Sequence, residues 1–459
     1  MKLLSLTLLL SGWIPNPFFP HPVRGQARDP LVYGPPLEPV HYYYDGWPTG
    51  IAVSSTGRMF SNYPIGLDAN DTKYQVAELT GNTTETPYPS AEMNSPPGGP
   101  INYTTNPMVS CLIPDLDISL TKVQTSANYR DYLIGVQSVV IDPKDRLWIL
   151  DTGRVSLPDG TLLLSSYGGP KLIGVDLASN TVFKTILFPP NVSYPDSVRT
   201  NQTIKLRKVE GASLTPSTQY NNDIRFDLRP NITESGEGIA YITDSSNEGR
   251  NGIIVVDLGT GESWRHLDNL LWVHPEPGFY LTIWGEPVYF ALGSDGITLS
   301  ADGETLYWTV VSGRYLYSVP TARLREHTSP TAQLLAAASV TRLTQKGVSD
   351  GLESDSNDYV YCGSFETNSI NVYFPQNGTV ATFVRDPRIE WTDTMSVVSL
   401  RNSSSEDSSG SGSSRGYLYF TENQLWRIPK VQGGVDRRAK PFTLYRVPLP
   451  DGGGKIQLT

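Results

Sequence analysis

The sequence predicts an all-β fold, a six-bladed β-propeller with long inserted loops, and two observations support it. Only 18% of the 459 residues are charged, whereas 41 are Gly, 36 are Pro and 25 are Tyr. This composition favours turns between aromatic and β-branched strands over helices. In addition, a turn rich in Gly or Asp that leads into an aliphatic or aromatic strand recurs along the chain. Because each propeller blade buries its faces against its neighbours, we expect residues 28–459 to form a single domain.

The repeats can be placed one by one. The first copy begins at Thr49 and the second at Val139. Later copies begin at Gly238, Gly296, Gly351 and Asp393, at intervals near the ~40 to 50 residues of a four-stranded blade. The first two intervals are longer and predict insertions at about residues 85–108 and 189–231. A Ser- and Gly-rich loop at about 402–415 is expected inside the sixth copy.

The N-terminal residues predict entry into the secretory pathway. Lys2 is followed by a short leucine-rich run and then by several prolines, which is typical of a signal peptide over residues 1–27. Asn-X-Ser/Thr acceptors for N-glycosylation also occur throughout the chain. The acceptors are Asn70, Asn82, Asn102, Asn191, Asn201, Asn231, Asn377 and Asn402. We therefore expect a secreted glycoprotein. No later apolar run approaches membrane-spanning length.

Charge and cysteine content limit the partners. With 36 basic and 46 acidic residues the formal charge is −10, and no basic stripe is visible, so nucleic acid is not an expected partner. The two cysteines, Cys111 and Cys362, can form at most one disulfide, which an oxidising compartment permits. The five histidines show no metal-ligand spacing. We expect no cofactor, and leave the metal unknown, with calcium open.

Several phrases resemble the yellow and major royal jelly protein family. They include Leu-Trp-Ile-Leu-Asp-Thr-Gly at residues 147–153, Lys-Gly-Val-Ser-Asp-Gly at 346–351 and Trp-Thr-Asp-Thr-Met at 391–395. These phrases follow the family order over nearly the whole mature chain. The resemblance implies a six-bladed propeller with a ligand pocket at one mouth of the central channel. It implies no single chemistry, because the family includes pigment-pathway proteins, salivary binders of biogenic amines and nutritive proteins. The Pro-rich N-terminus and the loop at 403–414 fit a fungal secreted member.

Acidic residues at strand ends are the first candidates for a site. In a propeller the innermost strands converge on the channel, so polar residues beside them can meet there. Such side chains could hold a cation or act as acid and base. Alternatively, they cap turns and bind backbone N–H groups between blades. The candidates are Asp151, Asp244, Asp350, Asp393 and Glu422, with Glu237 and Glu353 nearby.

Aromatic and cationic residues are the second set of candidates. Large flat side chains suit a pocket for a planar apolar ligand, although they also suit the core between blades. Arg154 follows the turn at 151–153 and could stabilise an oxyanion or phenolate, or form a surface ion pair. We predict catalytic roles for Asp151, Arg154 and Asp244. The predicted ligand-binding residues are Trp47, Trp284, Trp308, Arg314, Phe365, Trp391 and Asp393.

Four candidate functions are compared. A redox enzyme is disfavoured, because no nucleotide fingerprint, haem motif or cluster of His or Cys ligands is present. The favoured hypothesis is a cofactor-free catalyst that cyclises or isomerises a small, planar natural-product intermediate, as in a hetero-Diels-Alder step. The first alternative is a non-catalytic protein that binds a small amine or phenol. The second is a calcium-dependent hydrolase of the lactonase or esterase type.

Overall fold

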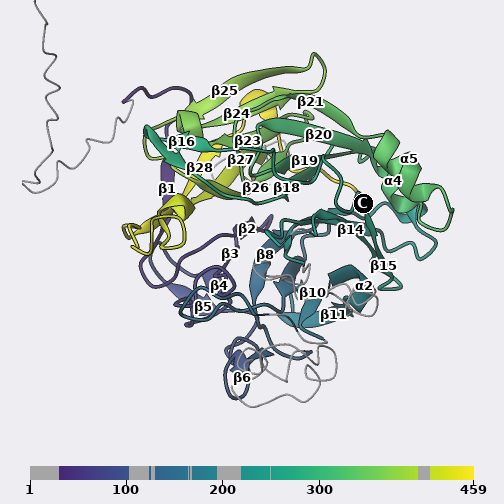
Figure 1. Cartoon of the computed structure of the whole chain (residues 1–459), viewed down its shortest axis with the longest axis horizontal. Helices are drawn as coiled ribbons and strands as arrows, with labels where there is room; N and C mark the ends of the chain where they lie inside the picture. The colour runs from purple at the N-terminus through teal and green to yellow at the C-terminus, as the bar shows by residue number, and fades with distance from the viewer. Residues whose placement is uncertain are drawn as a thin grey trace, which may run out of the picture.

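The computed structural model describes residues 30–102, 124–125, 130–163, 165, 168–193, 219–248, 250–401 and 414–459. The predicted signal peptide at 1–27 lies outside these residues. Cys111, Asn201 and Asn402 also lie outside them. The described strands are arranged in a ring around a central channel (Figure 1).

The ring consists of six four-stranded antiparallel sheets, so the predicted six-bladed propeller is confirmed. The first three blades follow the order of the chain. Blade 1 holds β2 (Ala52–Val53), β3 (Met59–Asn62), β4 (Val76–Leu79) and β5 (Glu85–Pro87). Blade 2 holds β8 (Val136–Ile141), β9 (Leu147–Thr152), β10 (Pro170–Asp176) and β11 (Thr181–Leu187). Blade 3 holds β12 (Asn221–Asp227), β13 (Ile239–Asp244), β14 (Gly252–Asp257) and β15 (Ser263–His266).

The last three blades complete the ring. Blade 4 holds β18 (Ser294–Leu299), β19 (Thr305–Val310), β20 (Tyr315–Pro320) and β21 (Thr341–Gln345). Blade 5 holds β22 (Leu352–Ser354), β23 (Val360–Ser364), β24 (Ser369–Phe374) and β25 (Thr379–Arg385). Blade 6 holds β26 (Thr392–Arg401), β27 (Ser414–Glu422), β28 (Phe442–Pro448) and β1 (Glu38–Tyr43).

The ring is closed by its first strand. β1 pairs antiparallel with β28, with His41 opposite Leu444, so strands about 400 residues apart share blade 6. The innermost strands of the six blades are β2, β8, β12, β18, β22 and β26, and they surround the channel. Most strands are buried on both faces. In β9, for example, every residue is buried, which explains its apolar run at 147–150.

Strands of the structure overlap the edges of the three predicted insertions. β12 lies inside the segment assigned to an insertion at about 189–231, and β5 occupies the start of the segment at about 85–108. A single 3-10 turn, η3 (Leu425–Arg427), follows β27. β27 starts at Ser414, within the loop placed at about 402–415.

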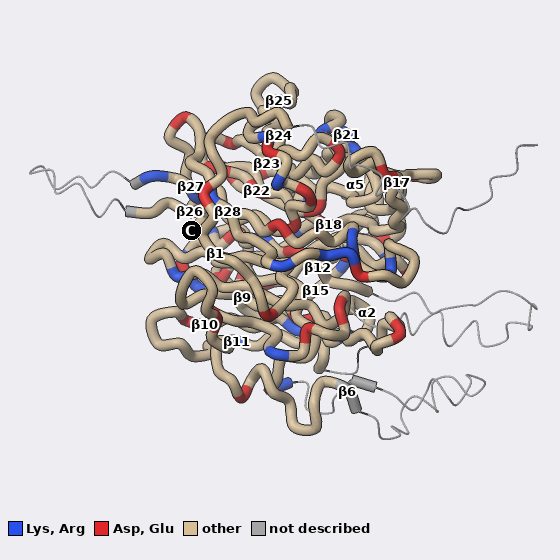
Figure 2. Tube along the Cα trace, turned by 90° about the vertical axis from the view of Figure 1, so that its left-hand side faces the viewer, with Lys and Arg blue, Asp and Glu red and all other residues tan. Residues whose placement is uncertain are grey.

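Few helices accompany the described strands. α4 (Thr321–Arg325) and α5 (Ala332–Ala338) connect β20 to β21, and α2 (Pro190–Ser193) follows β11. In chain order the hairpin of β16 (Leu281–Ile283) and β17 (Glu286–Val288) connects blades 3 and 4, and in space it packs near β24 and β28 (Figure 1). β6 (Ile101–Asn102) pairs with β7 (Gln124–Thr125). The remaining 3-10 turns are η1 (Pro230–Ile232), η2 (Phe365–Thr367) and η4 (Pro450–Gly452). Figure 2 shows basic and acidic residues interspersed over the side of the molecule that faces the viewer.

Candidate functional site

The channel carries a cavity at each end, and the innermost strands contribute to both. We call them the upper cavity, of about 810 Å³, and the lower cavity, of about 70 Å³. In β12, for example, Asn222 lines the upper cavity and Arg225 the lower one. In β18, Asp295 lines the upper cavity and Thr298 the lower one. The upper cavity therefore lies where the innermost strands begin, and the lower cavity lies toward their ends.

The floor of the upper cavity is built from one polar side chain of each of blades 2 to 6. The five residues occupy matching positions at or just before the start of their strands. Each is followed by a small or polar residue and then by a buried apolar one. The floor residues are Gln137, Asn222, Asp295, Asp350 and Asp393.

Irregular strand pairing sets the direction of these side chains. In β8, β12, β18 and β26 the pairing register with the next strand shifts at the position of the floor residue. A β-bulge of this kind breaks the regular alternation of side chains and re-aims the residue that it contains. The repeated shift explains how four blades direct a polar residue toward one point.

Hydrogen bonds hold each of the floor residues in place. The Tyr220 hydroxyl donates to Oε1 of Gln137 at 2.8 Å. Nδ2 of Asn222 donates to Oδ2 of Asp295 at 2.5 Å. On the other side, Nε1 of Trp391 donates to Oδ2 of Asp350 at 2.7 Å, and an Asn423 amide donates to Asp393 at the same distance. The floor is thus a preorganised polar surface rather than a set of separate side chains.

Three of the floor residues are carboxyl groups without a cation. Asp295, Asp350 and Asp393 are 4%, 5% and 7% exposed, and none forms an ion pair with another described residue. Burial, together with the charge of Asp350, raises the pKa of Asp295 and of Asp393 well above its usual range. Burial also raises the pKa of Asp350, but hydrogen bonds from Asp295 and Trp391 oppose that rise. The raised pKa of Asp295 therefore favours its protonated form.

The walls of the upper cavity are largely apolar. They come from the loop after β3, the loop after β9, the segment after the β16–β17 hairpin and the segment around η3. Charged side chains lie among them, with Arg438 in an ion pair with Asp68 at 2.6 Å. The apolar wall residues include Leu67, Leu157, Leu162, Tyr289, Phe290, Leu292, Leu425, Ile428 and Val431. An apolar cavity with a few convergent polar groups is the usual form of a small-molecule site.

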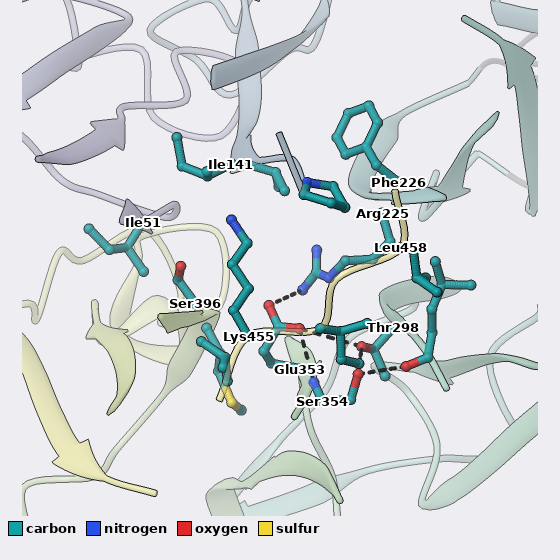
Figure 3. Close-up of a pocket in the computed structure, with 16 residues that line it drawn as sticks. Ile51, Ile141, Arg225, Phe226, Thr298, Glu353, Ser354, Ser396, Lys455 and Leu458 are labelled. Carbon is teal, nitrogen blue, oxygen red and sulfur yellow. Dashed lines mark hydrogen bonds and ion pairs between the residues drawn. The ribbon is translucent and has the colours of Figure 1, made fainter. Parts of the chain in front are cut away.

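The lower cavity has a different character, because its carboxylate, Glu353, faces a cation. Arg225 lies 2.8 Å from Asp223 and 3.4 Å from Glu353. Figure 3 shows Glu353 between Arg225 and Ser354, with the Lys455 side chain extending between Ile51 and Ile141. Nζ of Lys455 donates to the Asp142 carbonyl at 3.0 Å.

The C-terminal segment closes the lower mouth of the channel. Residues 453–458 cross the ends of the innermost strands, where Leu228 N donates to the Leu458 carbonyl at 2.8 Å. Lys455 N donates to Ser399 Oγ at 3.0 Å. Only the upper cavity is therefore large enough to accept an organic molecule of moderate size.

The three predicted catalytic residues lie outside the lining of the upper cavity. Asp151 accepts hydrogen bonds from the N–H groups of Ile134 and Gly135 and lies 2.8 Å from Nζ of Lys171. Asp244 accepts a bond from Tyr220 N and lies 2.8 Å from Arg265. These contacts match the alternative interpretation, in which strand-end aspartates cap turns.

Arg154, the third of them, is 1% exposed. Its guanidinium donates to the Gln219 carbonyl and to Glu248, both at 3.0 Å. The catalytic roles assigned to Asp151, Arg154 and Asp244 remain untested predictions.

The predicted aromatic ligand residues pack in the core. Trp47 donates to the Asn423 carbonyl at 2.7 Å, and the Trp284 ring meets Trp426 edge to face at 5.5 Å. Trp308 stacks on Tyr317 at 5.6 Å. None of these side chains belongs to the described lining of the upper cavity.

The remaining predicted ligand residues differ in their relation to the floor. Trp391 stacks on Phe365 at 3.9 Å and contacts two lining residues, Asp350 through a hydrogen bond and Phe290 edge to face at 5.2 Å. Arg314 pairs with Glu366 at 2.7 Å. Asp393 alone of the predicted ligand-binding residues lines the cavity.

The other acidic candidates are dispersed. Glu422 is buried and accepts bonds from the N–H groups of Glu390 and Trp391, both at 2.8 Å, and burial raises its pKa to about 8. Glu237 is exposed, and Glu353 lines the lower cavity. No group of three or more His, Cys, Asp or Glu side chains in the described part of the chain converges closely enough to hold a metal ion.

The sequence analysis missed Asp295, Asn222 and Gln137. A signal for Asp295 was present, because Ser-Asp-Gly-Ile at 294–297 repeats the Ser-Asp-Gly-Leu of 349–352. Aligning the two phrases would have placed Asp295 beside Asp350. Asn222 and Gln137 precede dissimilar residues, and their positions emerge only from the strand pairing.

The predictions about secretion concern the surface and one buried thiol. Five glycosylation acceptors are exposed: Asn70, Asn82, Asn191, Asn231 and Asn377. Asn70 also lies on the rim of the upper cavity. The side chain of Asn102 lies outside the described part of the structure. Cys362 is a buried free thiol in β23, and burial raises its pKa to about 12. Its predicted disulfide with Cys111 remains a prediction. No helix among the described residues is long and apolar enough to cross a membrane.

Comparison with known proteins identifies the family. The sequence profile of the family described as Major royal jelly protein matches residues 134–448, more than half of the chain. The chain belongs to this family. It is 26% identical over 265 residues to Major royal jelly protein 1 of Apis mellifera, covering 58% of this chain and 51% of that protein. It is 24% identical over 189 residues to Major royal jelly protein 7 of the same species, covering 41% and 35%. The chain thus matches about half, or less, of the length of these relatives.

Solved structures align over most of the chain at lower similarity. A calcium-binding regucalcin of Agrobacterium tumefaciens covers 93% of this chain and 97% of its own, with 11% identity and a TM-score of 0.43. A gluconolactonase of Xanthomonas campestris covers 92% and 99%, with 10% identity and a TM-score of 0.39. At these levels neither alignment bears on the function of this protein.

Proposed function

We propose that this protein binds a small, largely apolar organic molecule in the upper cavity and catalyses its cyclisation or isomerisation as an acid, without a cofactor. The observation that carries the proposal is the set of three buried carboxyl groups, Asp295, Asp350 and Asp393, on the floor of an apolar-walled cavity. A hetero-Diels-Alder closure is the reaction of this class that we favour.

Asp295 is the acid in this proposal. A carboxyl group that keeps its proton near neutral pH can hydrogen-bond to a carbonyl oxygen or protonate a departing hydroxyl. For a benzylic alcohol beside a phenol, Asp295 protonates the alcohol oxygen and water leaves. The phenol of the substrate then gives its proton to the Asp295 carboxylate, and the substrate becomes a quinone methide. The acid is regenerated, so the step consumes no oxidant or reductant.

The apolar walls would supply the second part of catalysis. Holding the quinone methide against an alkene makes the ring closure effectively unimolecular and can contribute several kcal/mol, up to about 7 to 11 in well-oriented systems. The wall residues Phe290, Leu292 and Leu425 present hydrocarbon surface beside the carboxyl floor. This arrangement suits a substrate with one oxygen-bearing end and an otherwise apolar body.

Binding of a protonated amine is the second candidate. The observation that favours it is the absence of a described cation beside Asp295, Asp350 and Asp393. An ammonium group in the cavity would supply that positive charge and release the protons of the acids. The calcium-dependent hydrolase has no comparable support among the described residues. Exhaustive treatment with EDTA tests it, because loss of activity that calcium restores would favour a hydrolase.

A binding experiment separates the first two candidates. Calorimetry in two buffers of different ionisation enthalpy would compare tryptamine with 3-ethylindole, a neutral probe of similar shape. The acid catalyst should bind 3-ethylindole without releasing a proton, and Asp295→Asn should weaken that binding. The matched control is Asp302→Asn, on the exposed turn after β18. Binding of tryptamine alone, with proton release, would instead support an amine-binding protein.

A reaction experiment tests the chemistry. The probes are 2-hydroxybenzyl alcohol and ethyl vinyl ether, and chroman formation is followed by mass spectrometry. We expect Asp295→Asn to lower the rate by about 10²-fold or more, the usual contribution of a positioned general acid. A wild-type rate equal to that of buffer, or to that of Asp295→Asn, would contradict acid catalysis by this residue.

A further inference from the structure

One wall of the upper cavity is a continuous stretch of chain that runs from its mouth to its floor. Residues 289–292 line the cavity in sequence, and Asp295 follows on the floor. Burial increases along this stretch, since Tyr289 is 69% exposed and Asp295 is 4% exposed. Six residues of extended chain span at most about 20 Å. The stretch therefore connects the mouth with the floor over a distance that one organic molecule can cover.

Two exposed aromatic residues stand at the outer end of this stretch, and we call them the aromatic pair. Tyr280 precedes β16 and Tyr289 follows β17, and their ring centroids lie 6.0 Å apart. Tyr280 is 50% exposed, and Tyr289 belongs to the lining of the upper cavity. Figure 2 shows β17 on the right-hand side of the molecule, away from the C-terminus, whose segment closes the lower mouth. The aromatic pair thus lies at the open mouth of the upper cavity.

The hairpin of β16 and β17 sets the direction of these two rings. Side chains alternate between the two faces of a strand. Leu281 is paired with Val288, and both are buried in an apolar cluster on the inner face of the hairpin. The neighbouring Tyr280 and Tyr289 are therefore turned to the outer face.

An ion pair holds the hairpin in place. Arg314, in the turn between β19 and β20, lies 2.7 Å from Glu366 of η2. The Arg314 guanidinium donates to the Tyr280 carbonyl, and the Thr282 N–H donates to the Glu366 carboxylate, both at 3.1 Å. Each half of the ion pair thus binds the backbone of β16 or the residue before it. The aromatic pair is therefore presented by a fixed element.

The size of the upper cavity favours a ligand that reaches the aromatic pair. Small-molecule sites of about 300 to 1,000 Å³ hold drug-sized ligands, and the upper cavity measures about 810 Å³. A single aromatic ring on the floor leaves most of that volume unfilled. A ligand with a hydrocarbon body fills the space between the apolar walls and covers the exposed rings, which removes apolar surface from water.

We propose that Tyr289, supported by Tyr280, forms an outer subsite of the upper cavity for the hydrocarbon end of a ligand whose oxygen-bearing end contacts Asp295. The proposal rests on the binding function of the cavity and names its substrate class. That class is a molecule with one polar end and an apolar body long enough to reach the mouth. Tyr289 is then a specificity-determining residue, because only a long body contacts its ring.

Binding of two phenols of different length tests the subsite. The probes are 4-ethylphenol and 4-octylphenol, and calorimetry measures the affinity of each for the wild type and for Tyr289→Ser. In the wild type, each additional buried methylene should raise the affinity about threefold to fourfold. We expect Tyr289→Ser to lower the affinity for 4-octylphenol by about tenfold, the effect of losing about 50 to 60 Å² of apolar contact. Its affinity for 4-ethylphenol should stay at the wild-type value.

Two further variants and a matched control locate the effect. Tyr289→Phe should bind 4-octylphenol as the wild type does, because the ring rather than the hydroxyl makes the contact. Tyr280→Ser should cause a smaller loss than Tyr289→Ser, since Tyr280 only supports the neighbouring ring. The matched control is Tyr33→Ser, which changes a tyrosine that is 58% exposed beside β25 and outside the lining of the upper cavity. It should leave both affinities unchanged, and equal losses in Tyr33→Ser and Tyr289→Ser would overturn the subsite.

The outcomes separate the outer subsite from the function on which it rests. If neither phenol binds the wild type, the binding function of the cavity and the outer subsite are both wrong. If both phenols bind but Tyr289→Ser weakens them equally or not at all, only the outer subsite is wrong. Loss of a dimer in light scattering of Tyr289→Ser, with both affinities unchanged, would assign the aromatic pair to a contact between two copies of the chain and would also overturn the subsite.

Discussion

The two mouths of the channel are built from the same innermost strands, yet the buried carboxyl groups of these strands have different partners at the two ends. At the lower mouth, Arg225 is paired with Asp223 and Glu353. At the upper mouth, Asp295, Asp350 and Asp393 share hydrogen bonds with amides and an indole but have no described cation. Paired charges stabilise or specify a fold, whereas buried acids that keep their protons are typical of sites that act on a ligand.

The largest expected effect comes from breaking a paired charge. Asp151→Ala should lower the free energy of unfolding by about 3 to 5 kcal/mol, because it leaves Lys171 buried without its partner. Asp295→Asn should change it by far less, because an amide of similar shape replaces a neutral carboxyl. Urea unfolding of both variants makes the comparison. Equal losses would remove the distinction between paired and unpaired acids.

The pH dependence of stability sharpens the same contrast. The pKa values of Asp295 and Asp393 are raised well above their usual range, and those of Asp71 and Glu422 are raised to about 8. The folded protein thus holds more protons than the unfolded chain above pH 4. Stability should fall as pH rises from about 4 to 8, by up to about 1.4 kcal/mol per pH unit for each such group. Thermal unfolding at several pH values should show that the stability of Asp295→Asn depends less steeply on pH than that of the wild type. An equal dependence in the two proteins would count against the raised pKa of Asp295.

Trp391 offers a smaller effect, confined to the upper mouth. Trp391→Phe keeps a ring against Phe365 but removes the donor to Asp350. We expect a loss of about 1 to 3 kcal/mol in stability, the cost of leaving a buried acceptor without its donor. The Asp350 carboxyl should also titrate at higher pH, because its anion has lost a hydrogen bond. An Asp350 midpoint equal to that of the wild type in NMR titration would remove this tryptophan from the site.

The smallest effect is expected at the lower mouth. Lys455→Met removes a buried ammonium and its bond to the Asp142 carbonyl, two changes that oppose each other in free energy. We expect stability to change by about 1 kcal/mol or less. Affinity of the upper cavity for 3-ethylindole should stay at the wild-type value. A large loss of affinity would show that the two mouths are coupled.

Sequence reasoning recovered the parts of the fold that are locally encoded. A turn followed by an apolar strand is a short sequence motif that indicates a blade. Asp350 and Asp393 were recognised as candidate site residues because they begin such motifs. The closure of blade 6 by β1 was not found, since its partner β28 lies about 400 residues away. β12 was hidden in a segment marked by glycosylation acceptors and prolines.

The ligand-facing residues were harder to separate from the core. Trp47, Trp284 and Trp308 have side chains of the type found in binding sites. The residue type alone does not reveal whether a ring faces the cavity or the core between blades. Asp151 and Asp244 follow the strand-end rule as well as Asp350 does, yet lie at the ends of second strands rather than at the starts of innermost ones. Only the sheet order makes that distinction.

Infrared spectroscopy of the protonated carboxyl groups at neutral pH tests the central claim most directly. Our account expects a carboxylic acid band in the wild type at pH 7 that weakens in Asp295→Asn and shifts when 3-ethylindole or another neutral probe fills the upper cavity. The band should survive in Asp302→Asn. If the wild type and Asp295→Asn show the same carboxylic acid signal, Asp295 is ionised in the wild type. That result would contradict the upper cavity as an acid site.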